Sequence, residues 1–310
     1  EEHPTAGGLR IGKPLPERKP GEPYDRRMEW EQDGQYFHYL TRWMHALNRM
    51  WGVTDEPRYH QWAVELAEAT VRGFARSDGG GRRLHWKMSI NLSRPLVPST
   101  GQHDPLDGYL TVATLRHTAP EDRAGVLTPE LHLLREMVEA GRGTWATSDT
   151  LGTGGLLIDT YRSIDLRSRE GREALRGLEA LPEELLDDSL RSVAAVAGSG
   201  FRARSAERRL AFRELGLSIG LGAVERMSDL VSAPETGGTE ADYEPEDESG
   251  SPPVPPGRIA ALERYLPLKD EIHRFWLDPE HRRSESWPGH RDISQVMLAT
   301  SLAPGGYLDV

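Results

Sequence analysis

Hydrophobic residues recur every three to four positions along most of the chain, which is the spacing of amphipathic α-helices. The clearest run lies between Glu29 and Trp51, where aromatic and aliphatic residues form a wide apolar stripe. A stripe of that width predicts a helix that packs on more than one side. A second helix is predicted from Glu56 to Arg76, and the short connection at Gly52 predicts an antiparallel helical hairpin.

The same spacing continues to the end of the chain, and only one short segment is typical of a strand. That extended segment runs from Leu84 to Ile90, after three consecutive glycines have ended the second helix. Prolines and glycines mark the other breaks between helices. The remaining predicted helices are Pro105 to Arg116, Pro129 to Ala140, a helix that begins near Leu156, Arg172 to Leu181, Pro182 to Ala197, Ala206 to Val231, Arg258 to Leu277 and Asp292 to Leu302.

Two segments depart from the helical pattern. Residues 1–27 contain five prolines and several glycines, so we expect an extended arm. Residues 234–257 combine seven acids between Glu235 and Glu248 with a proline-rich stretch, and they predict a solvated loop. Because the helices after this loop need packing partners, we expect a single helical domain over residues 28–310.

Polar loops rich in Trp, His and Asp precede several helices. The fullest runs from Trp86 to Gly108, and similar loops are predicted from Gly141 to Gly155 and from Ser284 to Asp292. In the first loop, Asp104 before Pro105 is typical of a helix N-cap, with Asp107 completing the helix start. Capping does not account for the polar residues upstream, which include Gln102, His103, Trp86 and Lys87.

Consecutive helical hairpins can close into a ring, in which loops before the inner helices converge at one end. The stretch YFHYLTRWMHAL at residues 36–47, together with the loop at residues 86–108, resembles an inner helix and loop of the (α/α)6 toroids. This group comprises the six-hairpin glycosidases and includes the N-acylglucosamine 2-epimerase-like proteins. The resemblance implies an all-α toroid with few short strands. The chain has fewer helices than a full ring, so either one hairpin is degenerate or part of the N-terminus is absent.

The resemblance also implies carbohydrate chemistry in a central funnel. Cleavage of a glycosidic bond needs one carboxylic acid and one carboxylate, and the candidates are Asp104, Asp107 and Asp149, with the pair left open. Epimerisation would instead use bases beside an acidic carbon, for which the candidates are His38, His103 and His290. A third alternative is a sugar-binding or scaffold toroid without catalysis, whose carboxylates would all cap helices or pair with arginines.

Sugar binding calls for aromatic platforms beside hydrogen-bonding side chains. The loops and the first helix supply both kinds of residue. The expected substrate-binding residues are Tyr36, Arg42, Trp86, Lys87, Arg94, Gln102, Trp145 and Trp287.

Composition narrows the remaining possibilities. The formal net charge is −11 and basic residues are dispersed, which argues against a nucleic-acid partner. No run approaches the roughly 20 apolar residues of a membrane helix, so a soluble, cytoplasmic protein is expected. The first residue is Glu1, consistent with removal of a leader or N-terminal segment.

Cofactors and metals are not expected. The chain lacks cysteine and any H-E-x-x-H pattern, and the glycine run at residues 152–155 lacks the lysine of a phosphate-binding loop. The expected partner is a small-molecule or oligosaccharide substrate, and the sequence leaves the oligomeric state open.

Overall fold

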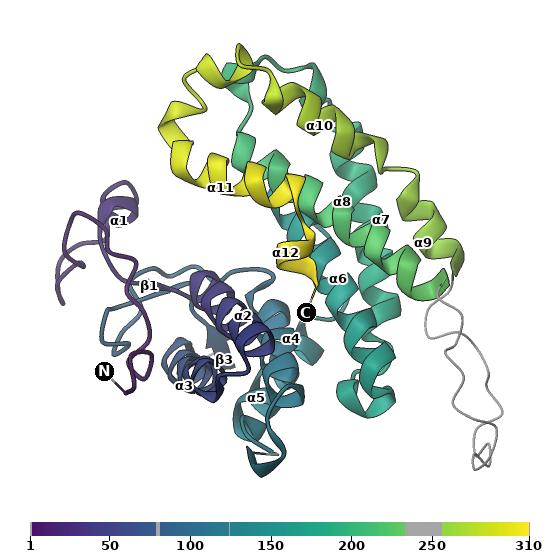
Figure 1. Ribbon diagram of the computed structural model, residues 1–310. Coiled ribbons are helices and arrows are strands. Elements are labelled where there is room, and N and C mark those ends of the chain that lie inside the picture. The colour runs from purple at the N-terminus through teal and green to yellow at the C-terminus, as the bar shows by residue number, and fades with distance from the viewer. Residues whose placement is uncertain (1, 79–80, 124, 233–255, 310) are drawn as a thin grey trace, which may run out of the picture. The chain divides into compact units, whose positions relative to one another are not determined.

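The computed structural model describes residues 2–78, 81–123, 125–232 and 256–309. Helix covers 65% of these residues and strand 5%, which confirms the mostly helical fold predicted from the periodicity. The chain divides into two compact units, Glu1–Arg142 and Gly143–Val310, and each is described by itself (Figure 1). The single domain expected over residues 28–310 stays a prediction. No helix in the described part of the chain is long and apolar enough to cross a bilayer.

Unit 1 is built on two helical hairpins, and the first is the one predicted from the sequence. The first helix continues through Gly52, which was expected to end it, and stops where Asp55 adopts a left-handed conformation with φ 55°. Pro57 then begins the next helix, where its missing N–H costs nothing. The helices of unit 1 are α1 (Met28–Glu31), α2 (Phe37–Thr54), α3 (Pro57–Phe74), the 3₁₀ turn Glu121–Arg123, α4 (Asp104–His117) and α5 (Thr128–Gly141).

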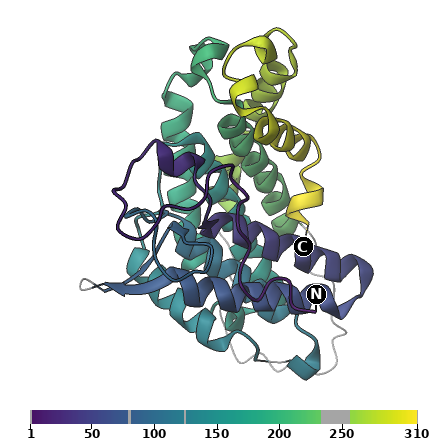
Figure 2. The same ribbon diagram turned by 90° about the vertical axis from the view of Figure 1, so that its left-hand side faces the viewer.

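Short strands hold the start of α2 against the polar loop. The helix expected from Glu29 to Trp51 is divided into α1 and α2, because Gln35–Tyr36 (β1) pairs antiparallel with Lys87–Met88 (β4) and extends the backbone there. The Phe37 amide also donates to the Trp86 carbonyl at 3.2 Å. Figure 2 shows a second antiparallel hairpin, β2 (Ala75–Asp78) with β3 (Gly81–Leu84), projecting from the helices of the unit.

Residues 2–27 run as an irregular arm without helix or strand (Figure 1). Gln35 joins this arm to the polar loop, since its side-chain amide donates to the carbonyls of Gly7 and Ile90. Further along the arm, Arg18 donates to the Leu96 carbonyl at 2.7 Å, and a Glu17 carboxylate oxygen accepts from the Ile90 amide. The arm therefore fixes the loop between residues 86 and 99.

A close approach of α2 and α4 positions the acidic residues of the loop. A Cβ atom placed on Gly108 would lie 2.8 Å from the Phe37 ring, so only glycine allows this spacing. Phe37 also packs edge-on against Phe74, with ring centroids 5.6 Å apart, which ties α2 to α3. As a result, the second turn of α2 faces the first turn of α4.

Unit 2 is organised around α6 (Thr150–Glu170) and α8 (Ala211–Ser232). Residues Thr153 to Leu166 are buried almost without interruption, so α6 is surrounded by other helices. A Cβ atom on Gly154 would lie 2.2 Å from the Gly216 carbonyl oxygen, and one on Gly220 would lie 2.6 Å from the Gly154 carbonyl oxygen. The two helices thus touch backbone to backbone.

This contact corrects the prediction of a loop from Gly141 to Gly155. The glycines at residues 152–155 lie inside α6, where Gly154 provides the close helix crossing. The loop itself ends at Asp149, which caps the helix.

Two other expected helices are also wrong. The segment Arg172 to Leu181 forms only a 3₁₀ helix, Arg172–Leu175, because Gly171 and Gly177 adopt positive φ values. The helix expected from Arg258 to Leu277 is broken before Pro267, which starts a new helix. Most of the loop expected at residues 234–257 lies outside the described residues.

The helices of unit 2 pack around one hydrophobic core that includes Trp276 and Trp287. Besides α6 and α8, they are the α-helices α7 (Leu181–Gly198), α9 (Pro256–Glu263), α10 (Pro267–Leu277), α11 (Arg291–Leu302) and α12 (Gly305–Leu308), with 3₁₀ helices at Arg172–Leu175, Phe201–Ala203, Ala206–Arg208, His281–Arg283 and Pro288–His290.

Candidate functional site

The structure brings two of the predicted carboxyl groups together in unit 1. Asp104 and Asp107 are both buried and lie one turn apart at the start of α4. Asp107 Oδ2 accepts a 2.6 Å hydrogen bond from the Thr41 hydroxyl, and its Oδ1 lies 3.3 Å from Arg42 Nη1. Thr41 and Arg42 belong to the turn of α2 that faces α4, so the close helix contact builds this pair. A charged partner and a hydroxyl donor both favour the carboxylate form of Asp107.

Asp104 has the opposite environment. His103, not Asp104, occupies the N-cap position of α4, so the expected capping role of Asp104 is wrong. Its Oδ2 atom is buried and accepts no hydrogen bond, and the carboxyl packs against the backbone of Gly101, where a Cβ atom would lie 2.2 Å away. Burial, aided by the nearby negative charge of Asp107, raises the pKa of Asp104 to about 7, while Arg42 acts in the opposite direction. The two neighbouring carboxyls therefore favour different protonation states.

His38 lies beside this pair as a neutral imidazole. Burial and then the Arg42 charge lower the pKa of His38 to about 4, against the effect of Asp107. Its Nδ1 atom accepts a 3.2 Å hydrogen bond from Trp86 Nε1, and because an indole nitrogen only donates, the ring proton resides on Nε2. His38 is thereby a hydrogen-bond donor at Nε2 and a poor base.

Aromatic side chains surround His38 and extend to the surface. The Trp86 ring stacks on His38 with centroids 6.0 Å apart, and Tyr39 meets the His38 ring edge-on at 4.5 Å. Trp30 packs against Trp86 at 5.3 Å and is itself half exposed, as is Tyr39. Buried Tyr36 lies between them. The cluster thus presents aromatic edges and faces to solvent next to the acid pair.

A cavity of about 300 Å³ lies over the exposed side of α2. It is lined by Tyr39, Arg42, Trp43 and Ala46. Arg42 links the cavity to the acid pair, because its guanidinium reaches Asp107 while part of the side chain stays exposed. Trp43 is 54% exposed, an unusual position for so large an apolar ring.

Two other predicted binding residues of unit 1, Lys87 and Arg94, have structural roles. Lys87 is fully buried, and its Nζ donates to the Glu29 carbonyl at 2.6 Å and the Gln32 carbonyl at 2.8 Å and lies 3.1 Å from the Glu29 carboxylate. Arg94 donates to the Arg18 carbonyl in the arm. Both residues fasten the loop to the N-terminal segments, whereas Gln102 is exposed and His103 half exposed just before α4.

The remaining predicted residues belong to unit 2. Asp149 is the N-cap of α6, accepting from the Gly152 amide at 2.8 Å, and it pairs with Arg213. Trp145 is buried, so it offers no exposed sugar platform, and its amide donates to Asp188. His290 is exposed and lies over the Phe212 ring at 5.3 Å. Trp287 is also buried, at 6% exposure. A funnel that unites these residues with His38 and His103 stays a prediction.

Several residues of the site were not singled out from the sequence. Thr41 holds Asp107, and Trp30, Tyr39 and Trp43 supply the exposed aromatic surface. The spacing of Tyr39 and Trp43, four residues apart on one helix, is a signal for a shared face, but it does not tell whether that face is buried. Thr41 carries no such signal, because its partner lies 66 residues away.

Within the described residues, no three His, Asp or Glu side chains are grouped so that they could hold a metal ion. In comparisons with models of protein families, with curated proteins and with solved structures, nothing matches this chain.

Proposed function

We propose that unit 1 carries the acid–base centre of a carbohydrate-active enzyme that cleaves a glycosidic bond, on a toroid of helical hairpins like that of the six-hairpin glycosidases. The observation that carries this proposal is the contrast between the two acids. Asp104 is buried with a pKa of about 7, while Asp107 is held by Arg42 and Thr41. Glycoside hydrolysis requires one protonated and one ionised carboxyl group.

In the proposed reaction, the Asp104 carboxylic acid donates its proton to the leaving glycosidic oxygen as the bond from that oxygen to the anomeric carbon breaks. The Asp107 carboxylate either takes a proton from the water that attacks this carbon or attacks the carbon itself, with water completing hydrolysis in a second step. The stereochemistry of the product distinguishes the two routes. The pair with Arg42 and the bond from Thr41 orient the Asp107 carboxylate.

The substrate surface fits the flat faces of sugar rings. Trp30, Tyr39 and Trp43 are each about half exposed, and the cavity over α2 is large enough for one or two sugar units. The Nε2 proton of His38 has no acceptor among the described residues and is available to a substrate hydroxyl. Arg42 adds charged donors at the same place.

The properties of His38 favour hydrolysis over epimerisation. An epimerase needs a base whose pKa is near the working pH. The pKa of His38 is lowered to about 4, and its basic Nδ1 is already occupied by Trp86. In a sugar-binding protein without catalysis, all the carboxylates would cap helices or pair with arginines. This describes Asp107 and Asp149 but not Asp104.

The test is release of reducing ends from a panel of neutral and acidic oligosaccharides by the full chain. We expect Asp104→Asn to lower turnover by roughly 10²–10⁴-fold, as for loss of a general acid. We also expect kcat/KM of the parent protein to fall as pH rises through about 7, because Asp104 must be protonated. The matched control is Asp165→Asn, since burial also raises the pKa of Asp165, which lies in unit 2.

Equal losses in the Asp104 and Asp165 variants would contradict the proposal, because they would reflect general damage to the fold. Sugar binding by thermal shift without any turnover would assign unit 1 to the non-catalytic alternative. If no sugar of the panel is bound or turned over, carbohydrate chemistry is excluded for unit 1.

A further inference from the structure

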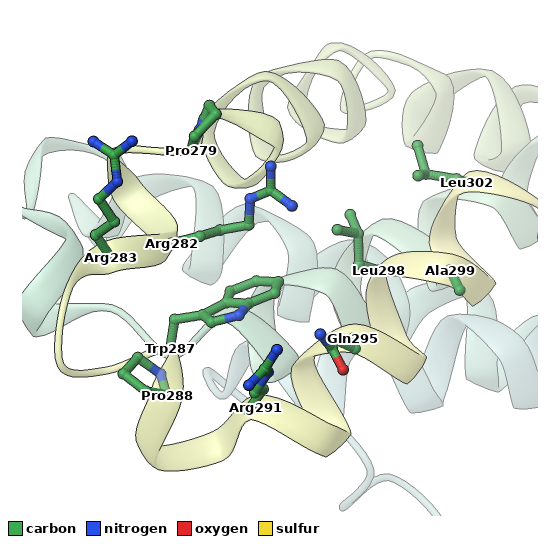
Figure 3. A pocket seen from close by; sticks show the side chains of 10 residues that line it. All are labelled: Pro279, Arg282, Arg283, Trp287, Pro288, Arg291, Gln295, Leu298, Ala299 and Leu302. Carbon is green, nitrogen blue, oxygen red and sulfur yellow. The ribbon is translucent and has the colours of Figure 1, made fainter.

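A second cavity, of about 620 Å³, lies entirely within unit 2 and is lined by three arginines. It is formed by the segment that follows α10 and by the exposed side of α11 (Figure 3). Arg282 and Arg283 come from the 3₁₀ turn after α10, and Arg291 is the first residue of α11. Figure 3 shows the side chains of Arg282 and Arg291 on either side of Trp287.

These arginines are poorly neutralised by the protein. Arg283 and Arg291 form no side-chain hydrogen bond or ion pair with any described residue. Arg282 donates to the Leu277 carbonyl at 3.1 Å, but its Nε atom is buried without an acceptor. None of the described residues that line the cavity is an Asp or a Glu. The exposed guanidinium donors at the cavity are therefore available to an anionic oxygen.

The rest of the lining is apolar. Trp287 is buried against Trp276, with ring centroids 5.8 Å apart, and the Arg282 guanidinium carbon lies 5.9 Å from the Trp287 ring centroid. Leu298 is buried beside it, whereas Leu302 at the edge remains 51% exposed. The cavity therefore combines guanidinium groups with an aromatic and aliphatic wall.

This combination selects for ligands of one chemical class. Guanidinium groups bind the oxygens of phosphate or carboxylate with two parallel hydrogen bonds, and they do so more strongly away from water. The chain as a whole has a net charge of −11, so a gathering of unpaired arginines is not a consequence of an excess of basic residues. The volume lies in the range of small-molecule sites.

We propose that this cavity binds a small amphiphilic anion, in which a flat apolar ring lies against the apolar part of the lining and an oxyanion is held by Arg282 and Arg291. The site goes beyond the acid–base function of unit 1 and does not depend on it. No covalent step is involved, because no nucleophile or acid lines the cavity among the described residues.

The test is isothermal titration of the full chain with phenyl phosphate at low ionic strength. Benzoate shows whether a carboxylate replaces the phosphate. Benzyl alcohol keeps the ring without the charge, and inorganic phosphate keeps the charge without the ring. We expect phenyl phosphate to bind at least tenfold more tightly than either benzyl alcohol or inorganic phosphate, because each lacks one half of the interaction.

Variants then locate the site. Arg291→Gln should weaken phenyl phosphate binding at least tenfold, the usual effect of losing a charged hydrogen bond. Arg291 is exposed, so the variant should fold as the parent does. The matched control is Arg204→Gln, an exposed arginine of unit 2 that does not line the cavity and changes the net charge equally.

Three results would overturn the proposal. They are benzyl alcohol binding as tightly as phenyl phosphate, an equal loss of affinity in the Arg204 control, and the absence of measurable binding of both phenyl phosphate and benzoate. Because the comparison of probes uses the parent protein alone, a variant that fails to fold does not leave the proposal undecided.

Discussion

The raised pKa of Asp104 predicts that its replacement by asparagine becomes more favourable to stability as pH rises. A carboxyl whose pKa is higher in the folded protein than in the unfolded chain binds its proton more tightly when folded. The stability that comes from this proton is fully present at pH values below the pKa of the unfolded chain. It is lost as pH rises toward the pKa of the folded protein, and it changes no further above that value. For Asp104 this interval runs from the ordinary value of 3.8 to about 7.

The magnitude follows from the same two values. A difference of about 3 between them, at 1.36 kcal/mol for each pKa unit, corresponds to roughly 4 kcal/mol of stability lost by the parent protein between pH 4 and pH 8. An asparagine side chain does not titrate, so Asp104→Asn removes this loss. The variant carries a constant penalty for its buried amide, and only the pH-dependent part of the difference reports on the carboxyl.

The assay is urea denaturation of the parent and the Asp104→Asn variant at intervals between pH 4 and pH 8. We expect the free energy of unfolding of the variant, relative to the parent, to rise by about 4 kcal/mol across this range. Asp55→Asn, at an exposed position after α2, is the control and should show a flat difference. A flat difference for Asp104→Asn, or one that falls with pH, would refute the reasoning.

Four further substitutions test other parts of the structure by denaturation. Gly154→Ala should cost at least about 2 kcal/mol by forcing α6 from α8, whereas Gly155→Ala, which meets open space, should stabilise by about 0.5–1 kcal/mol through helix propensity. Lys87→Met should cost about 3–5 kcal/mol, because it leaves the buried Glu29 carboxylate without its cation; a change below 1 kcal/mol would contradict that role. Asp149→Ala should cost about 1 kcal/mol as a lost helix cap and leave turnover unchanged, and a large loss of turnover would place Asp149 in the catalytic site.

The helices were predictable because their burial is periodic in the sequence. The hairpin of α2 and α3 shows this best, since its apolar stripe can be recognised without knowledge of any partner helix. The glycines at residues 152–155 show the limit of such reasoning. A glycine that permits a close helix crossing looks the same in sequence as a glycine in a loop, and only Gly216 and Gly220, more than sixty residues later, distinguish the two.

The candidate site was predictable in its residue types more than in their roles. Asp104, Asp107, His38 and Trp86 were all selected, and the structure places them together. Their protonation could not be predicted, because it depends on which carboxyl meets Arg42 and which is packed against Gly101. The arginines of the second cavity gave no usable signal, since Arg291 lies eight residues after Arg283 and the chain has many dispersed arginines.

The N-terminal arm has a consequence for the order in which unit 1 folds. Glu17 and Arg18 bond to Ile90 and Leu96, which lie 73 and 78 residues further along the chain. Closing loops of this length costs more chain entropy than forming a helical hairpin, so these contacts should form late, after α2 and α3 have paired. During synthesis, the arm leaves the ribosome long before its partners exist. The loop that carries Trp86 is therefore secured by a segment that is made well before it, and this contact is among the last to form.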